Sequence, residues 1–332
     1  MPALCRNRVF RMHDGLVHRL ASLTRRLLAP ERATDRDAPL SSAGAAGTTL
    51  VEVAAFGDNP GRLGMKLLLP APAPRPGAPL LVLLHGCGQD AVRFAEASGF
   101  AALAQRQGAA LLLPDQAIDN NPQRCFNWFR PADIARGGGE AASIRAMVSE
   151  AVRRCAADPR RVFVAGLSAG GAMAAALLAA YPDAFAAGGV VAGLPVGAAT
   201  DAHAALLQMT RPQLRPRDAW HALLAAGATG GPWPRLSVWH GTADHVVDPG
   251  NAAALVGQWT ARLGLPEAPE RVTQPAPHLT RHCWGADVEY WSIAGYGHAF
   301  PVADGMAADP FVLPAGIAAA AAMARFWGLG DL

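Results

Sequence analysis

The stretch RVFVAGLSAGGAMAAALLAA, residues 161–180, decides how this chain folds. Its first part, Arg161–Ala165, is an apolar run that predicts a buried strand, and Ala172–Ala180 predicts a helix of small residues. Between them Gly166-Leu167-Ser168-Ala169-Gly170 fits G-x-S-x-G, which places a nucleophilic serine on a strained strand-to-helix turn. Side chains two positions before and after that serine would collide, which explains both glycines. We predict that Ser168 is the nucleophile of a hydrolase.

Short apolar runs and helical patterns alternate on both sides of this stretch. Strands are expected at Leu80–Leu84, Ala109–Leu113, Ala187–Ala192, Leu236–Trp239 and Val288–Ile293, and helices at Ala91–Gln107, Gly139–Ala156, Asn251–Leu263 and from Phe311 onward. Runs without polar alternation fit strands that are buried on both faces of a parallel sheet. Thr48–Phe56 and Leu63–Leu69 predict an edge hairpin. We expect an α/β fold in which helices cover both faces of a mostly parallel central sheet.

The chain divides into an appendage and one catalytic domain. Residues 1–47 are rich in arginine and end in a Ser/Ala/Gly stretch, so we expect a basic N-terminal appendage with a linker. Residues 48–332 form the predicted catalytic domain. Within it, residues of about 195–234 contain no strand pattern and predict a lid-like insertion.

Composition limits the class of protein. The 332 residues are 51% hydrophobic and 17% charged, with a net charge of +3, which supplies a large core and gives no case for nucleic acid as a partner. No apolar run reaches the roughly 18 residues of a membrane span without a break, so no membrane span is expected. Arginines interrupt the N-terminus, so we expect a cytoplasmic protein, with export by an unusual leader as the alternative. The five cysteines form no CxxC pair, and the chemistry needs no metal or cofactor.

A serine hydroxyl needs a base and an orienting acid, which such folds supply later in the chain in the order acid, then histidine. Asp244 follows the strand Leu236–Trp239 and is the predicted acid, with Asp248 as its competitor. His298 follows the last strand beside glycines and is the predicted base.

The oxyanion hole needs two backbone donors. One is the N–H of Ala169, directly after the serine. The other is expected after the early strand, in His85-Gly86-Cys87-Gly88, where the N–H of Cys87 is the predicted donor and that of Gly88 the alternative. A nucleophilic Cys87 thiol would need an activating base that the sequence does not show. His85 and His240 are interpreted as turn-forming residues.

Several motifs together resemble the poly(3-hydroxybutyrate) depolymerase family of esterases. They are Leu84-His85-Gly86-Cys87-Gly88-Gln89, Cys125-Phe126-Asn127-Trp128-Phe129, Gly166–Met173, His240-Gly241-Thr242-Ala243-Asp244 and Gly297-His298. The likeness runs from about Phe56 to Phe300. It implies an α/β-hydrolase fold, and it maps a catalytic triad onto Ser168, Asp244 and His298.

The resemblance also implies a substrate class. It points to poly- or oligo(3-hydroxybutyrate) or other short-chain hydroxyacyl esters, with soluble oligomers or small esters favoured because no polymer-binding domain is visible. Acetyl or feruloyl esters of polysaccharides are the alternative, and a serine peptidase or an inactive binding protein of the same fold is less well supported. The resemblance further implies that Cys87 and Cys125 can pair, the alternative being two reduced thiols, and that Trp128 lines the substrate pocket or belongs to the core.

Overall fold

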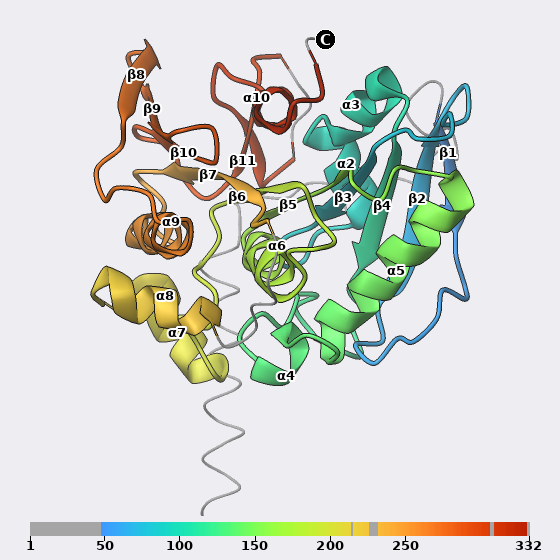
Figure 1. Cartoon of the computed structure of the whole chain (residues 1–332), viewed down its shortest axis with the longest axis horizontal. Coiled ribbons are helices and arrows are strands. Elements are labelled where there is room, and N and C mark those ends of the chain that lie inside the picture. The colour runs from blue at the N-terminus through green and yellow to red at the C-terminus, as the bar shows by residue number, and fades with distance from the viewer. Residues whose placement is uncertain (1–47, 214, 226–231, 306–308, 331–332) are drawn as a thin grey trace, which may run out of the picture. The chain divides into compact units, whose positions relative to one another are not determined.

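The computed structural model describes residues 48–213, 215–225, 232–305 and 309–330. Within them ten strands form one sheet in the order β1-β2-β4-β3-β5-β6-β7-β10-β9-β8 (Figure 1). These strands are β1 Thr48–Glu52, β2 Gly64–Pro70, β3 Leu80–Leu84, β4 Ala110–Asp115, β5 Val162–Leu167, β6 Ala187–Val191, β7 Arg235–Gly241, β8 Arg271–Ala276, β9 Leu279–Trp284 and β10 Val288–Ile293. The run from β4 to β10 is parallel, and antiparallel pairs extend it at both edges. The predicted mostly parallel sheet is confirmed.

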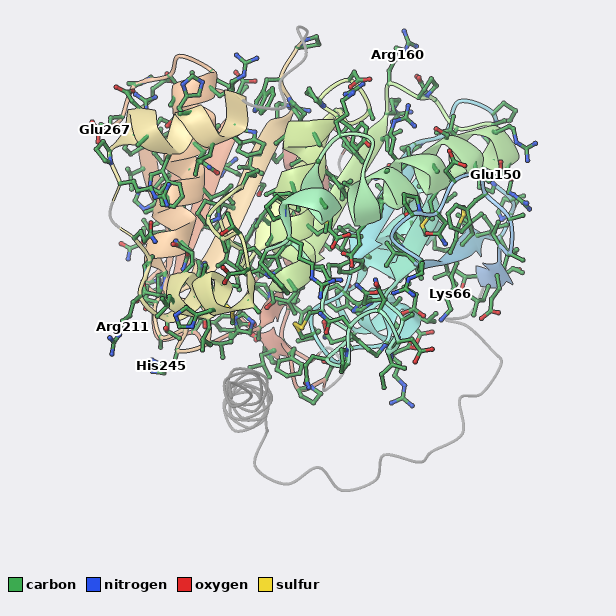
Figure 2. The ribbon with its side chains drawn as sticks, turned by 90° about the horizontal axis from the view of Figure 1, so that it is seen from below. Lys66, Glu150, Arg160, Arg211, His245 and Glu267 are labelled. Carbon is green, nitrogen blue, oxygen red and sulfur yellow. A yellow bond between two sulfur atoms is a disulfide. The ribbon has the colours of Figure 1, made fainter. Side chains whose placement is uncertain are left out.

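Helices cover both faces of the sheet (Figure 1). On one face lie α4 Pro131–Ile134, α5 Gly139–Cys155, α6 Ala169–Ala180 and α9 Gly250–Arg262. On the other lie α2 Ala91–Ala97, α3 Phe100–Gln107 and α10 Ala319–Trp327. None of the described helices is both long and apolar enough to cross a membrane. Charged side chains such as Arg160, Arg211 and Glu267 project at the periphery (Figure 2).

The two apolar cores explain the unbroken apolar runs of the central strands. In β3, Leu80, Val82 and Leu84 pack into one core, while Leu81 and Leu83 pack into the other. Successive side chains of a strand point to opposite faces, so a strand covered on both faces must be apolar at every position. All five side chains of β3 are buried.

The structure corrects three predicted elements. The helix expected over Ala91–Gln107 is two helices, because Gly99 adopts a left-handed φ of 81° between α2 and α3. The closing helix begins at Ala319 and not at Phe311, because β12 (Val312–Pro314) instead pairs with β11 (Phe300–Val302). The hairpin of β8 and β9 was not predicted, since five of the six residues of β8 are exposed and show no apolar alternation. The predicted appendage, residues 1–47, lies outside the described residues.

The described part of the predicted insertion contains two helices, α7 Ala202–Thr210 and α8 Arg217–Ala225, and no strand. Buried amide side chains of α9 hold it in place. Gln258 Oε1 accepts from the Val196 N–H at 2.9 Å, and its Nε2 donates to the carbonyls of Val196 and Trp220 at 2.9 and 3.2 Å. At the start of α9, Asn251 exchanges hydrogen bonds with Gln208 at 2.8 and 3.0 Å. The insertion is therefore fastened to α9 at two points.

Gln258 supplies a direct test of this fastening. We expect Gln258→Leu to lower the free energy of unfolding by about 1–3 kcal/mol, because the backbone groups that it satisfies would be left buried without partners. Urea unfolding measures the change. Gln274→Leu, at an exposed position, is the control and should stay within about 0.5 kcal/mol of wild type. Equal stabilities of the two variants would show that the amide contributes nothing.

Candidate active site

Ser168 sits on the turn between β5 and α6 with a strained backbone. Its φ and ψ are 56° and −118°, a conformation that non-glycine residues rarely adopt. The turn is fixed by the Ser168 N–H, which donates to the Val191 carbonyl at 2.9 Å, and by the Ser168 carbonyl, which accepts from Ala172 at 2.9 Å. Strain of this kind is maintained only where the surroundings impose it, and it is concentrated at functional sites.

Backbone crowding accounts for the two glycines of the motif. A Cβ placed on Gly166 would lie 2.3 Å from the carbonyl oxygen of Gly170. One on Gly170 would lie 2.3 Å from the carbonyl oxygen of Leu84 and 2.5 Å from that of His85. Real Cβ atoms do not approach backbone this closely. The predicted collision is therefore confirmed. At Gly170 it involves the end of β3 and the residue after it, at the start of the loop of residues 85–88, which is called the oxyanion loop below.

The three predicted triad residues follow strands whose carboxyl ends share one edge of the sheet. Ser168 follows β5, Asp244 follows β7 and His298 follows β10, and these strands are parallel with β6 between the first two. The loops that follow β7 and β10 are joined by the Ala243 N–H, which donates to the Tyr296 carbonyl at 3.0 Å. Parallel topology thus brings residues separated by 130 positions in the chain to the same edge.

Asp244 and His298 form a buried acid–base pair. His298 Nδ1 lies 2.7 Å from Asp244 Oδ2, and the side chains are 6% and 0% exposed. Asp244 Oδ1 accepts from the N–H groups of Val246 and Val247, both at 2.9 Å. Since Nδ1 donates to the carboxylate, Nε2 of His298 is left as a proton acceptor.

Two opposing effects act on the pKa of Asp244. Burial alone would raise this pKa, but hydrogen bonds from His240 and His298 and electrostatic attraction to them hold it far below its ordinary value. Asp244 therefore stays ionised. The competitor Asp248 instead accepts from the Gly250 N–H at 2.8 Å, at the start of α9.

His240 is a contributor that the sequence interpretation missed. Its Nε2 lies 2.8 Å from the Val247 carbonyl and 3.1 Å from Asp244 Oδ2, so it both shapes the turn and contacts the acid. Its Nδ1 is buried without a partner among the described residues. The sequence feature that could have indicated this contact is the position of His240 near the end of the strand, four residues before Asp244, which places the two side chains next to each other in a tight turn.

The predicted oxyanion donors, Ala169 and Cys87, follow β5 and β3 respectively. Ala169 is the first residue of α6, so its N–H has no acceptor within the helix. The alternative donor Gly88 is already engaged, because its N–H donates to the Gln123 carbonyl at 2.8 Å. That leaves the N–H of Cys87 as the candidate in this loop.

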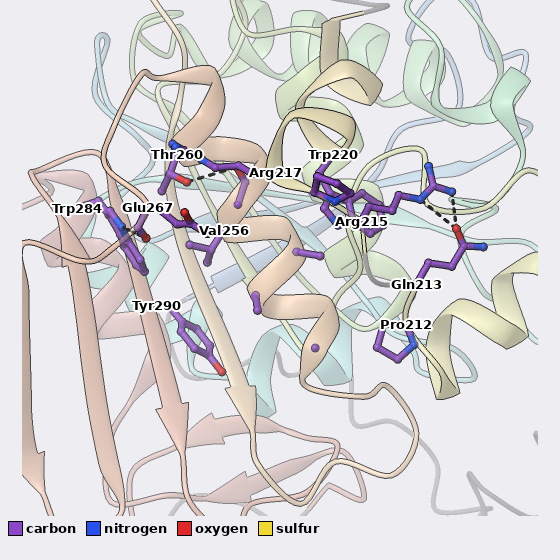
Figure 3. Close-up of a pocket in the computed structure, with 15 residues that line it drawn as sticks. Pro212, Gln213, Arg215, Arg217, Trp220, Val256, Thr260, Glu267, Trp284 and Tyr290 are labelled. Atoms are coloured by element: carbon purple, nitrogen blue, oxygen red, sulfur yellow. Dashed lines mark hydrogen bonds between the residues drawn. The ribbon is translucent and has the colours of Figure 1, made fainter.

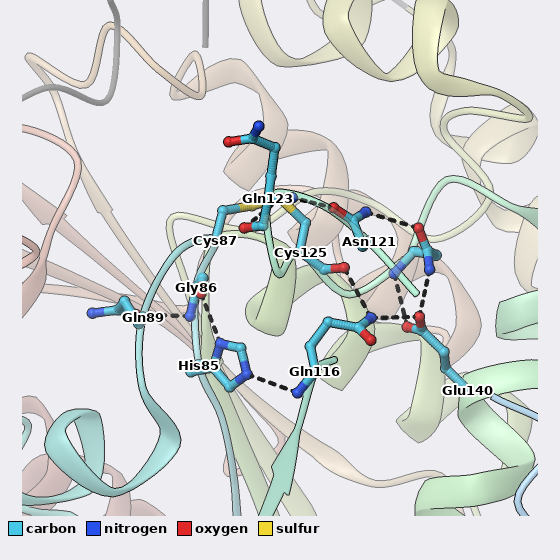
Figure 4. The surroundings of a disulfide bond; sticks show 10 residues. His85, Gly86, Cys87, Gln89, Gln116, Asn121, Gln123, Cys125 and Glu140 are labelled. Atoms are coloured by element: carbon cyan, nitrogen blue, oxygen red, sulfur yellow. Dashed lines mark hydrogen bonds between the residues drawn. A yellow bond between two sulfur atoms is a disulfide. The ribbon is translucent and has the colours of Figure 1, made fainter. Parts of the chain in front are cut away.

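Cys87 is joined to Cys125 by a disulfide, shown in Figure 4. The bond connects the oxyanion loop to the loop that carries Trp128. Trp128 is 6% exposed and packs in a small apolar cluster with Ala169, Leu194 and Val247. The cluster also includes Ala199, so it brings together the turn that carries Ser168, the loop that carries Asp244 and the insertion around the ring of Trp128.

A buried carboxyl organises the loop behind the disulfide (Figure 4). Glu140 Oε2 accepts from the Asn127 N–H at 2.7 Å. Its Oε1 accepts from the side-chain amides of Asn127 and Gln116 at 2.6 Å each and of Asn120 at 3.2 Å. Gln116 also donates from its backbone N–H to His85 Nε2 at 3.2 Å, so His85 carries its proton on Nδ1 and donates it to the Gly86 carbonyl at 2.8 Å. Glu140 thus anchors both loops that meet at the disulfide.

Among the described residues, no group of three or more His, Cys, Asp or Glu side chains could hold a metal ion. The arrangement offers a hydroxyl on a strained turn, an imidazole oriented by a carboxylate, and two backbone N–H groups. Serine hydrolases use such a set of groups for nucleophilic acyl transfer.

A substitution of Gly170 tests the backbone crowding at the turn that carries Ser168. We expect Gly170→Ala to reduce esterase turnover by about a hundredfold, because the new methyl must displace β3 or that turn by a sizeable fraction of an ångström or more. Steady-state kinetics on a p-nitrophenyl ester measure this effect. Gly257→Ala is the control, since a Cβ there meets no atom within 4 Å. Wild-type turnover in Gly170→Ala would contradict the packing argument.

Glu140 generates a prediction about pH. Burial raises its pKa from 4.5 to about 7, although hydrogen bonds from Asn127 and Gln116 oppose the rise. The folded state then binds this proton more tightly than the unfolded chain, so the contribution of Glu140 to stability falls as pH rises from about 4.5 to 7. Over that range wild type should lose up to about 3 kcal/mol of unfolding free energy relative to Glu140→Gln.

Urea unfolding at several pH values checks this slope. Glu52→Gln, which removes an exposed carboxyl, is the control and should follow wild type. Parallel pH profiles for wild type and Glu140→Gln would show that the carboxyl does not titrate in this way.

Comparison with known proteins adds independent information. A family model described as esterase PHB depolymerase matches residues 63–271. Poly(3-hydroxyalkanoate) depolymerase C of Paucimonas lemoignei is 37% identical over 292 residues, covering 84% of this chain and 70% of that protein. Feruloyl esterase B of Talaromyces funiculosus is 31% identical over 280 residues, covering 81% and 78%. A solved acetyl xylan esterase from Aspergillus awamori has a TM-score of 0.75 at 24% identity, covering 85% of this chain and 100% of that one, and it supports the α/β-hydrolase fold.

Proposed function

Because this chain belongs to the PHB depolymerase family of esterases, we propose that it hydrolyses short-chain hydroxyacyl esters, with soluble oligomers of 3-hydroxybutyrate as the substrate class. The protein is a serine hydrolase that acts on carboxylic ester bonds, as its relatives are. The depolymerase named above acts on poly(3-hydroxyalkanoate) by its name, and that is the comparison on which the substrate class rests.

One observation carries the catalytic assignment. The 2.7 Å contact between Asp244 and His298 lies at the edge of the sheet where the strained turn presents Ser168. Ser168 is assigned as nucleophile, His298 as general base and acid, and Asp244 as the group that orients the imidazole and stabilises its charged form.

The first half of the reaction forms an acyl-enzyme. Ser168 Oγ bonds to the ester carbonyl carbon as its proton passes to His298 Nε2. The carbonyl oxygen becomes an oxyanion, which the N–H groups of Cys87 and Ala169 stabilise. The bond to the alcohol oxygen then breaks, and that oxygen takes the proton from His298.

The second half releases the acid. A water molecule gives a proton to His298 Nε2 while its oxygen bonds to the acyl carbon. The tetrahedral species collapses by breaking the bond to Ser168 Oγ, which takes the proton back. Asp244 remains ionised throughout, consistent with its lowered pKa.

The surroundings of Ala169 are apolar. Trp128, Leu194 and Val247 form a buried apolar cluster against it. Apolar surroundings beside the nucleophile suit an aliphatic acyl unit such as that of 3-hydroxybutyrate. Acetyl or feruloyl esters of polysaccharides form the second candidate, because a feruloyl esterase is 31% identical over most of the chain.

Substitution of the triad tests the assignment. We expect Ser168→Ala and His298→Ala to lower kcat on p-nitrophenyl butyrate by about a thousandfold or more, because the three groups act as a unit. Asp244→Asn should lose a comparable factor, since the amide would favour the wrong imidazole tautomer. Asp248→Asn is the matched control and should keep kcat within about threefold. Full activity in Ser168→Ala would remove the nucleophile assignment.

Substrate preference is read from a separate set of assays. Wild type should hydrolyse p-nitrophenyl acetate and butyrate faster than the octanoate, and it should cleave soluble 3-hydroxybutyrate oligomers. Faster cleavage of methyl ferulate or acetylated xylan than of these oligomers would favour the second candidate.

A further inference from the structure

A groove of about 670 Å³ lies outside the catalytic centre, between α9, the insertion and the outer strands (Figure 3). Its walls include Arg215, Arg217 and Trp220 from the insertion, and Trp284 and Tyr290 from β9 and β10. Neither the triad nor the oxyanion loop lines it. The groove is therefore a separate cavity with its own chemistry.

The floor of the groove is the side of α9 that carries small residues. Gly250, Ala253, Ala254 and Gly257 line it, and a Cβ built on Gly257 meets no heavy atom within 4 Å. The floor follows α9 from Gly250 to Thr260, which corresponds to about 15 Å of helix at 1.5 Å per residue. The shape is an elongated channel that suits a linear chain.

One end of the channel lies close to the active edge of the sheet. α9 begins at Gly250, at the end of the loop that follows β7 and carries Asp244. The channel leads from that edge toward Trp284 and Glu267 at the other end of α9 (Figure 3). A polymer with one ester near Ser168 could therefore extend along α9.

The walls of the groove combine apolar surface with the guanidinium groups of two arginines. The guanidinium of Arg215 lies 5.0 Å from the ring of Trp220 and donates to Gln213 Oε1 at 3.0 and 2.6 Å. Arg217 donates to the Leu265 carbonyl, but its Nε is buried without a partner among the described residues. Within that part of the chain neither arginine forms an ion pair with a carboxylate. The groove thus presents two guanidinium groups that pair with no described carboxylate, while the unpartnered Arg217 Nε is itself buried beneath its surface.

These properties select among linear polymers. The interior of an aliphatic oligoester has methyl and methylene groups and carbonyl acceptors but no donors, and one end carries a carboxylate. An oligosaccharide presents many hydroxyl donors, which need acceptors. Gln213 Oε1 already accepts from Arg215, so the side-chain acceptors that remain include the exposed carboxylate of Glu267 and the hydroxyl of Tyr290. Apolar walls with guanidinium donors therefore complement an oligoester better than a sugar chain.

We propose that the groove along α9 is a second binding site for an aliphatic hydroxyacid oligoester, which holds the part of the chain that extends beyond the catalytic centre. The arginines bind ester carbonyls or the terminal carboxylate, and the floor of α9 and the edges of Trp220 and Trp284 pack against the methyl-bearing backbone. This inference rests on the proposed oligoester function.

Filling the floor of the groove tests the proposal. Gly257→Phe places a ring in the open space, and Gly257→Ala is the matched control that leaves the groove open. Arg215→Gln removes a donor without altering the floor. We expect Gly257→Phe and Arg215→Gln to raise KM for a 3-hydroxybutyrate tetramer by about tenfold, while kcat/KM for p-nitrophenyl butyrate stays within about twofold. An unchanged KM for the tetramer in both variants would overturn the proposal.

Binding to Ser168→Ala separates this proposal from the proposed function. If wild type cleaves p-nitrophenyl esters but not the tetramer, the oligoester function fails, and calorimetry of the tetramer with Ser168→Ala then decides the groove. Binding that is lost in Ser168→Ala/Gly257→Phe supports the site, and no binding overturns it. Binding of xylotetraose that Gly257→Phe abolishes would also overturn it, because the groove would then hold a sugar chain.

Discussion

The close approach of α6 to the backbone of β3 and β5 is the constraint on which the active edge depends. Glycine has no Cβ, so Gly166 can pack against the backbone of Gly170, and Gly170 can pack against the carbonyls of Leu84 and His85. This contact, together with the hydrogen bonds of the Ser168 backbone, holds the strained turn in place. It also fixes the distance from that turn to the loop after β3, which holds Cys87. Nucleophile and oxyanion loop are thus positioned by one packing contact.

Two buried acidic side chains, Asp244 and Glu140, hold the surrounding loops, and their pKa values are shifted in opposite directions. Asp244 receives hydrogen bonds from two histidines and two backbone N–H groups, which outweigh its burial and keep it charged. Glu140 receives neutral amides alone, and burial outweighs them, so its pKa rises. The difference follows from partner charge, since imidazole groups that can become cations stabilise a carboxylate more than amides do. The acid that serves catalysis is the one that remains ionised.

The insertion connects the catalytic edge with the groove. Its first part contributes Ala199 to the apolar cluster beside the nucleophile, and its later part supplies Arg215 and Arg217 to the wall of the groove along α9. The buried amides of α9 fasten both parts. A substrate chain long enough to occupy both places would therefore contact both described parts of the insertion, whereas a small ester would contact only the cluster.

The sequence by itself determined the alternation of strands and helices, the strained serine and the strand-end positions of Asp244 and His298. These features are local, because the pattern of apolar residues and the need for glycine at a crowded turn can both be recognised from residues that are neighbours in the chain. The sequence did not reveal the contact of His240 with Asp244, the Glu140 network, the β8–β9 hairpin or the groove. The Glu140 network and the groove depend on groups that only packing brings together, such as Gln116 with Glu140 and Arg217 with Trp284. The hairpin and the His240 contact are local in the chain, but the exposed β8 shows no apolar alternation and a single histidine in a turn gives no pattern. Such contacts leave no periodic signal, so only the tertiary structure decided them.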